Sequence, residues 1–124
     1  MAQSDFRPGY IITNEGDSIS GQINFRVGSG NYEECQFQKE GFVKNYGPSD
    51  LKQYGFINDR IYISKYLPED DIPNKKVFLE ILAKGEVNLF KYNAAFYVEK
   101  GMEEFYKLTN QVKKTNVDGN TYYQ

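Results

Sequence analysis

Turn signals recur along most of this 124-residue chain at intervals of about 8–12 residues, and this spacing constrains the fold more than any other feature. The signals combine glycine, proline, asparagine and aspartate, which β-turns favour. They lie at positions 14–17, 28–31, 40–41, 47–50, 58–59, 68–74, 84–85, 93–94 and 100–101. Segments this short leave little room for long helices, so the spacing predicts an all-β chain.

Between the turns, apolar and polar residues alternate. The stretches "SISGQINF" at 18–25, "DRIYISKY" at 59–66 and "EVNLFKY" at 86–92 each follow a period of two. Successive side chains of a strand point to opposite faces of a sheet, so this period is typical of strands with one buried face.

The segment "KVFLEILAKGEVNLFKY" at 76–92 has two interpretations. In a helix, Phe78, Ile81 and Leu82 would share one face. The segment has no usual N-cap, however, and positions 84–85 fit a tight hairpin turn between two strands. The hairpin is the favoured interpretation. Both faces of its first strand would be apolar, which is typical of a central strand covered on each side.

We therefore predict one β-rich domain over residues 1–124, with a core at 5–108 and a weakly structured tail or truncated C-terminal extension at 109–124. The expected fold is an antiparallel meander of about eight to ten strands that forms a sandwich or partly open barrel. One short helical turn is expected at 49–54, capped by Ser49. The expected core residues are Ile12, Ile19, Ile23, Phe37, Phe56, Ile61, Ile63, Val77, Leu79, Ile81, Val87, Leu89, Phe96 and Val98.

Composition argues against several classes of function. The chain has no histidine, so the commonest general base and the commonest transition-metal ligand are missing. Its one cysteine, Cys35, lies in an alternating segment and is expected to be a small buried apolar residue. A net charge of −2 without a basic stripe argues against nucleic acid, and no apolar run approaches the roughly 20 residues of a transmembrane helix.

No stretch matches a motif for a cofactor or a metal. "GSGNYE" at 28–33 lacks the third glycine of a dinucleotide fingerprint and is expected to connect two strands. The acidic run at 69–71 lacks the spaced ligands of a calcium loop and is expected to be a solvated loop. We therefore predict neither cofactor nor metal and assign no catalytic residue.

The tyrosines are the most suggestive candidates for a binding site. Five of them fall within or at the ends of expected strands: Tyr54, Tyr62, Tyr66, Tyr92 and Tyr97. On one exposed face they would form a rigid platform for a glycan or a protein. The alternative is that each ring packs into the core with its hydroxyl at the rim.

Several stretches together resemble an uncharacterised family of exported proteins of Bacteroidetes-type bacteria. They are "DFRPGYIITNEGDSISGQI", "YGPSDLKQYGFINDRIYISK", "VFLEILAKGEVNLFKY" and "FYVEK". The shared positions are turn glycines and core aromatics, so the resemblance implies an extracytoplasmic β-rich fold and no particular chemistry. It also implies that the chain follows a removed signal peptide, with a native start near Ala2 and Gln3, and that further sequence follows the tail.

We expect a non-catalytic, periplasmic, outer-membrane-associated or secreted domain that binds a protein or a cell-surface glycan. One alternative is a structural module of a longer envelope protein, acting through strand pairing or as a homo-oligomer joined by edge strands. The other is a small hydrolase with two carboxylates in a pocket.

Overall fold

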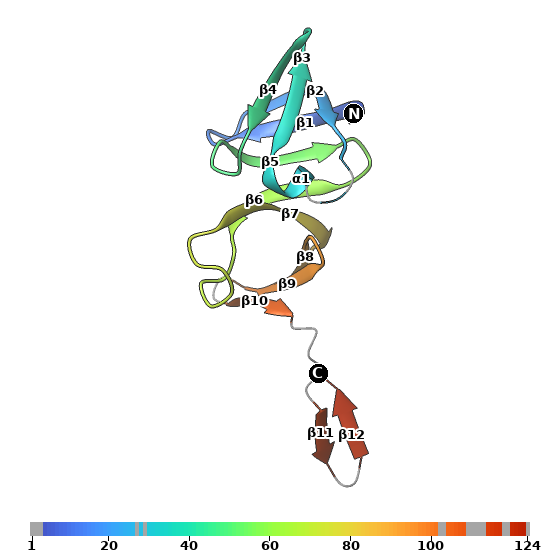
Figure 1. The fold of residues 1–124 in the computed structure, drawn as a ribbon, viewed down its shortest axis with the longest axis vertical. Helices are drawn as coiled ribbons and strands as arrows, with labels where there is room; N and C mark the ends of the chain where they lie inside the picture. Colours follow the sequence, from blue (N-terminus) through green and yellow to red (C-terminus); the bar gives the residue numbers. More distant parts are fainter. Residues whose placement is uncertain are drawn as a thin grey trace.

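The computed structural model describes residues 4–26, 28, 30–101 and 104–108, together with strands at 114–117 and 120–123. Ten of its strands form one antiparallel sheet (Figure 1): β1 (Phe6–Thr13), β2 (Ser18–Asn24), β3 (Cys35–Lys39), β4 (Phe42–Tyr46), β5 (Leu51–Phe56), β6 (Ile61–Tyr66), β7 (Lys76–Ala83), β8 (Val87–Tyr92), β9 (Ala95–Lys100) and β10 (Glu104–Leu108). A short helix, α1 (Gly30–Glu33), lies between β2 and β3. β11 (Lys114–Val117) and β12 (Asn120–Tyr123) pair with each other in a separate sheet.

The strand order is β10-β9-β8-β7-β6-β5-β1-β2-β3-β4. The chain runs as two meanders, β1–β4 and β5–β10, and β5 returns to pair with β1. The predicted all-β antiparallel fold of about eight to ten strands is confirmed, with ten strands in the main sheet. The sheet stays open, because its edge strands β4 and β10 lie at opposite ends of the order.

Residues 76–92 form the predicted hairpin of β7 and β8, so the helical interpretation is wrong. Glu80 lies opposite Lys91 and Ile81 opposite Phe90, and the register then shifts so that Ala83 faces Leu89. The shift leaves Leu82 as the extra residue of a β-bulge.

Two glycines allow close packing around the first meander. Gly9 of β1 lies opposite Gly21 of β2. A Cβ on Gly9 would lie 2.5 Å from the carbonyl oxygen of Gly55 on β5, and one on Gly21 would lie 2.5 Å from the Phe37 ring. Side chains at these positions would therefore push the curled strands apart.

β6 and β7 lie between the β1–β5 half and the β8–β10 half of the sheet (Figure 1). The sheet buries a separate core on each face of these two strands. The first core lies under the β1–β5 half and α1 and comprises Ile11, Ile23, Tyr32, Cys35, Phe37, Leu51, Tyr54, Phe56, Tyr62 and Phe78. The second lies within the β7–β10 half and comprises Leu67, Val77, Leu79, Phe90 and Tyr97. Phe78 thus enters the first core and its neighbours Val77 and Leu79 the second, which confirms β7 as a central strand covered on both sides.

The predicted core is correct only in part. Six of its members are buried: Ile23, Phe37, Phe56, Val77, Leu79 and Val98. Six more are only partly buried: Ile12, Ile19, Ile61, Ile63, Ile81 and Leu89. Val87 and Phe96 are wrong, since they are 45% and 37% exposed. Alternation separates the two faces of a strand but does not tell which one is covered, and here the covered face changes along the sheet.

The single short helix is confirmed in kind, but its predicted place at 49–54 is wrong. There the chain makes a turn in which the Gly47 N–H donates to Asp50 Oδ2 at 2.7 Å, and β5 begins at Leu51. The helix instead lies within the connection between β2 and β3. The expected native start near Ala2 and Gln3 falls outside the described residues, as do the side chains of 109–124.

Cys35 is fully buried in the first core, as predicted. Burial raises the pKa of its thiol well above the ordinary value. Because the thiolate is the reactive form and each unit of raised pKa lowers its fraction about tenfold at neutral pH, an aromatic disulfide reagent should react at least about tenfold more slowly with the native protein than with the protein in denaturant. Absorbance of the released reagent measures the rate. Equal rates in the two solutions would contradict the buried placement.

Candidate functional site

The five candidate tyrosines do not share an exposed face. Tyr54, Tyr62 and Tyr97 are at most 1% exposed. Tyr54 and Tyr62 stack in the first core with ring centroids 4.8 Å apart, whereas Tyr97 belongs to the second core. Tyr66 is 55% exposed and Tyr92 is half-buried. The predicted platform is corrected accordingly: three of its five rings lie inside the two cores, and of the five only Tyr66 is largely exposed.

One cross-strand row leads from the first core to the surface. Tyr62 lies opposite Glu80, Glu80 opposite Lys91, and Lys91 opposite Phe96. Directly opposite residues project from the same face of a sheet. Along this row the side chains pass from 1% exposed at Tyr62, which meets Tyr32 of α1, to 37% exposed at Phe96 at the far end, and α1 packs mainly over β7. The sheet face beyond α1 is therefore open.

The connection between β2 and β3 forms a wall beside this open face. Asn31, which is 1% exposed, holds the connection in place. Its Oδ1 accepts a hydrogen bond from the Arg26 N–H at 2.8 Å, and its Nδ2 donates to the carbonyl oxygen of Asn24 at 3.0 Å. The Tyr54 hydroxyl donates to the backbone carbonyl of Asn31. The wall is thus fixed to the first core by an internal network of hydrogen bonds.

The β2–β3 connection is the wall, and the open sheet face is the floor, of a cleft of about 670 Å³. We define the cationic cleft by these lining residues: Phe25, Arg26, Gly28, Tyr32, Arg60, Lys91, Asn93, Ala94 and Phe96. Three of them carry positive charge and three carry aromatic rings. They come from both halves of the sheet, and the order of the residues in the sequence does not bring them together.

Acidic neighbours partly balance the cations of the cleft. Arg26 pairs with Glu34 at 3.1 Å, and Arg60 Nε lies 4.0 Å from Glu80, which is also the partner of Lys91 across the strands. Within the described residues, the lining itself carries three cations and no acid, while Glu34, Glu80 and Asp59 act on two of these cations from outside the lining.

Arg60 is the central cation of the cleft. Its guanidinium carbon lies 5.0 Å from the centroid of the Phe25 ring. The Tyr62 hydroxyl raises the pKa of Arg60, and burial raises the pKa of Tyr62 to about 12. The arginine therefore stays charged and the tyrosine stays neutral throughout the physiological range of pH. With 44% of its side chain exposed, Arg60 can still donate hydrogen bonds to a ligand.

A smaller hollow of about 270 Å³ lies on the opposite face of the β8–β9 hairpin. Its walls include Asp71, Tyr97 and Lys107. The Tyr97 hydroxyl donates to Asp71 Oδ2 at 2.6 Å, and Lys107 Nζ lies 3.4 Å from Asp71 Oδ1. Burial and the neighbouring carboxylate raise the pKa of Tyr97. These polar groups satisfy one another and attach the 67–75 loop to β9 and β10, which gives this hollow a structural explanation.

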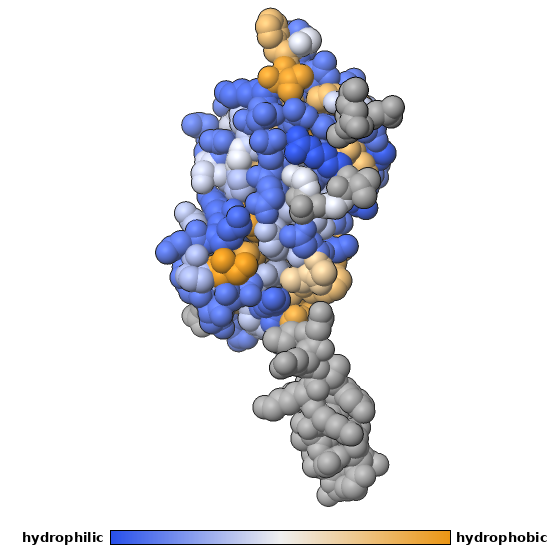
Figure 2. Space-filling model, viewed as in Figure 1, coloured by the Kyte–Doolittle hydropathy of each residue, from blue (hydrophilic) through white to orange (hydrophobic). Residues whose placement is uncertain are grey.

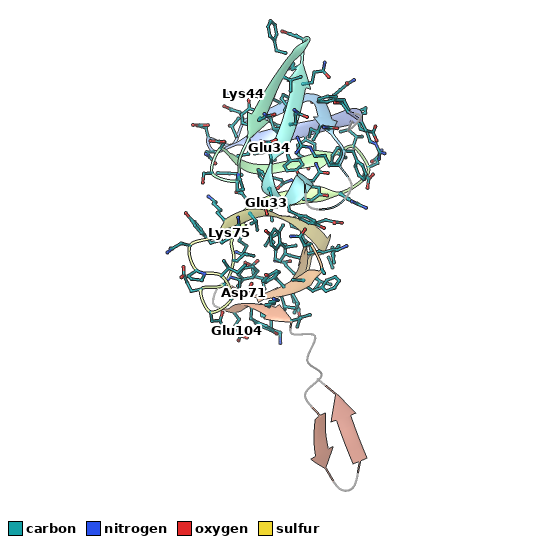
Figure 3. The ribbon with its side chains drawn as sticks, viewed as in Figure 1. Glu33, Glu34, Lys44, Asp71, Lys75 and Glu104 are labelled. Atoms are coloured by element: carbon teal, nitrogen blue, oxygen red, sulfur yellow. The ribbon has the colours of Figure 1, made fainter. Side chains whose placement is uncertain are left out.

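The two halves are also joined through Glu33 of α1 (Figure 3). Glu33 Oε1 accepts a hydrogen bond from the Tyr92 hydroxyl at 2.5 Å, and Glu33 Oε2 lies 3.4 Å from Lys75 Nζ. Burial raises the pKa of Tyr92 to about 12. Tyr92 therefore acts as a hydrogen-bond donor between the halves and is not a free ring on a binding face.

Comparison of the chain with known protein families, with curated proteins and with solved structures finds no match. Within the described residues, no group of three or more acidic or cysteine side chains is placed to hold a metal ion. In the same part of the chain, no helix has the length and apolarity needed to cross a membrane.

Sequence reasoning missed the cationic cleft. Lys91 and Phe96 occupy opposed positions on one hairpin, so their proximity follows from the turn at 93–94. No local signal brings Arg26 and Arg60 to the same place, because they meet only when the first meander curls over β6.

Proposed function

We propose that this chain is a non-catalytic, extracytoplasmic interaction domain that binds a segment of a partner protein in the cationic cleft. The observation that carries the proposal is the cleft itself. It has a volume of about 670 Å³, is open to solvent, and is lined by arginine, lysine and aromatic side chains. Arginine and aromatic residues are enriched at protein interfaces, where they supply much of the binding energy.

The lining of the cleft favours binding over hydrolysis. A retaining or inverting glycosidase needs two carboxyl groups about 5–10 Å apart in one pocket. Among the described residues, no acid lines the cationic cleft, and Asp71 is the one acid that lines the smaller hollow. The burial of Tyr54, Tyr62 and Tyr97 also removes the flat aromatic surface that would suit a neutral glycan. A protein segment is therefore the preferred ligand.

The extracytoplasmic part of the proposal is supported by the resemblance to exported β-rich proteins. Mass spectrometry of the protein isolated from its native cells tests it. We expect the protein in a periplasmic, outer-membrane or secreted fraction. Recovery only from the cytoplasm would contradict export.

Binding to the cell envelope tests the interaction. A fluorescently labelled domain should bind isolated native envelopes saturably, and the unlabelled domain should compete. Phe96→Ala should weaken this binding, since Phe96 is an exposed ring of the cleft floor. A truncated hot-spot residue typically costs at least about 2 kcal/mol, or roughly 30-fold in affinity.

The matched control is Phe42→Ala, which removes a ring that is 80% exposed on β4, outside the cleft. It should leave envelope binding within about twofold, since truncation of most residues outside a hot spot costs little. Binding that is not saturable, or that responds equally to both substitutions, would contradict the assignment of the cleft.

The edge strand β4 supports a second candidate function, strand pairing or self-association in a longer envelope protein. Among the described strands, β4 pairs only with β3, and at its start Phe42 and Val43 are 80% and 49% exposed. Figure 2 shows apolar colouring at the top of the view, where Figure 1 places this end of the β3–β4 hairpin. Unpaired edges are templates for a further strand, although Lys44 in the middle of β4 opposes pairing with an identical copy. Sedimentation at rising concentration, with Phe42→Lys for comparison, decides between a monomer and such an assembly.

A further inference from the structure

We propose that the cationic cleft recognises an acidic peptide segment in which carboxylates flank an aromatic side chain. This inference rests on the proposed function and names the chemistry of the partner. The carboxylates would accept hydrogen bonds from Arg26, Arg60 and Lys91, and the aromatic ring would pack on Phe96 between them.

The cations of the cleft retain donors for such a ligand. A guanidinium has five N–H donors, and Arg60 directs its Nε toward Glu80 at 4.0 Å, longer than a hydrogen bond. Arg26 uses one terminal nitrogen for both Glu34 and Gln36, at 3.1 and 3.3 Å. The N–H groups of Arg60 that do not face Tyr62 or Glu80, and those of Arg26 that do not face Glu34 and Gln36, can take a carboxylate in the two-pronged geometry that arginine favours.

Phe96 is the free aromatic surface of the cleft. The Phe25 ring already has two guanidinium partners, with Arg7 and Arg60 lying 3.9 and 5.0 Å from its centroid. Phe96 contributes no such pair and is 37% exposed at the end of the row that begins at Tyr62. The small turn residue Ala94, two positions before it, also lines the cleft, so an aromatic side chain of a ligand can pack on the exposed part of the Phe96 ring.

The acids beside the cleft limit the charge of the ligand. Glu34 and Glu80 lie within ion-pair distance of two of the three cations, so a densely charged polyanion would meet repulsion as well as attraction. A short segment with a few carboxylates can place each one against a donor and avoid both glutamates. This balance favours an acidic peptide over a nucleic acid or a strongly charged polysaccharide.

Fluorescence anisotropy with a defined probe tests the inference. The probe is a labelled pentapeptide with one phenylalanine flanked by two glutamates on each side, and its matched control has glutamine in place of every glutamate. We expect the acidic peptide to bind at least about tenfold more tightly than the neutral one, because hydrogen bonds to charged groups are the stronger class. Binding of the acidic peptide should also weaken as salt is raised.

Two substitutions locate the contacts. Arg60→Gln and Lys91→Gln each remove one positive charge from the lining of the cleft. Each substitution should weaken acidic-peptide binding by about tenfold. Lys44→Gln removes the same charge from an exposed position on β4 that does not line the cleft, and it should have no effect. Circular dichroism of every variant verifies that the fold is intact. Equal affinity for the two peptides, or equal effects of Lys44→Gln and Lys91→Gln, would overturn the inference.

The same assay separates this inference from the proposed function. If native envelopes bind saturably and depend on Phe96 while the acidic pentapeptide neither binds nor competes, the ligand class is wrong and the interaction domain stands. If oligogalacturonate competes and the pentapeptide does not, the carboxylates belong to a sugar, which also overturns the peptide assignment. If the envelopes do not bind at all, the proposed function fails first.

Discussion

Replacing Phe78 with alanine should lower the free energy of unfolding by about 3–5 kcal/mol, the range measured for large aromatic truncations in protein cores. Phe78 is fully buried and meets the Tyr54 ring edge-on, with centroids 4.8 Å apart. The substitution removes this aromatic pair and leaves a cavity under α1. Urea denaturation followed by circular dichroism measures the loss. A milder variant, Phe78→Leu, keeps most of the side-chain volume. It should lower the free energy of unfolding by about 0.5–3 kcal/mol, a loss that remains measurable if the alanine variant does not fold.

Neighbouring positions on β7 make this a test of the two-core arrangement. Leu79→Ala should cost about 2–5 kcal/mol, although its side chain points to the opposite face of the sheet. Leu82→Ala on the bulge, where the side chain is 42% exposed, should change stability by no more than about 0.5 kcal/mol. If Leu79→Ala were as harmless as Leu82→Ala, the second core would not contribute to folding, and the structure would be wrong about that half of the sheet.

Asn31→Leu should be nearly as costly, for a different reason. The leucine fits the buried site approximately but leaves the Arg26 N–H and the Asn24 carbonyl without their partner. Each unsatisfied buried group typically costs about 1–3 kcal/mol. The wall of the cationic cleft should loosen at the same time, because Asn31 is what ties it to β2. Urea denaturation gives the global effect, and amide hydrogen exchange gives the local one.

The exchange pattern distinguishes a loosened wall from general destabilisation. Amides of Arg26 and Tyr32 should exchange faster in the Asn31→Leu variant, whereas those of β9 should change only as much as global stability does. Asn45→Leu, the same substitution at an exposed site on β4, serves as the control and should stay within about 0.5 kcal/mol. Uniformly faster exchange throughout the sheet would mean that Asn31 stabilises the whole fold and not the β2–β3 connection in particular.

The local structure of this chain was largely predictable from its residues. Glu40, Asn58, Asn74 and Asn93 adopt positive φ at or beside the predicted turns, and glycines at 16, 28, 41 and 101 do the same. These turn residues and the period-two segments between them place most strands correctly, including the β7–β8 hairpin. The exception is the helical turn predicted at Ser49. Ser49 lies in a turn that precedes β5, and the short helix forms at Gly30–Glu33.

The candidate site was much less predictable. Tyrosines were expected to be either a platform or packing, and burial decides for packing at Tyr54, Tyr62 and Tyr97. Their hydroxyls do not keep them at the surface, because partners exist inside: the Asn31 carbonyl for Tyr54 and the Asp71 carboxylate for Tyr97. The sequence positions of the three cations did not predict a cleft, because charged residues on or beside a strand normally indicate only a solvent-exposed face.

The sequence by itself determined where the chain turns, which segments extend, and that β7 has two apolar faces. These properties depend on φ preferences and on neighbours within a few residues. Only the tertiary structure decided which face is covered and that Arg26, Arg60 and Lys91 lie around one cleft. Both depend on the two halves of the sheet curling toward opposite faces, and that curl follows from contacts between strands far apart in the chain.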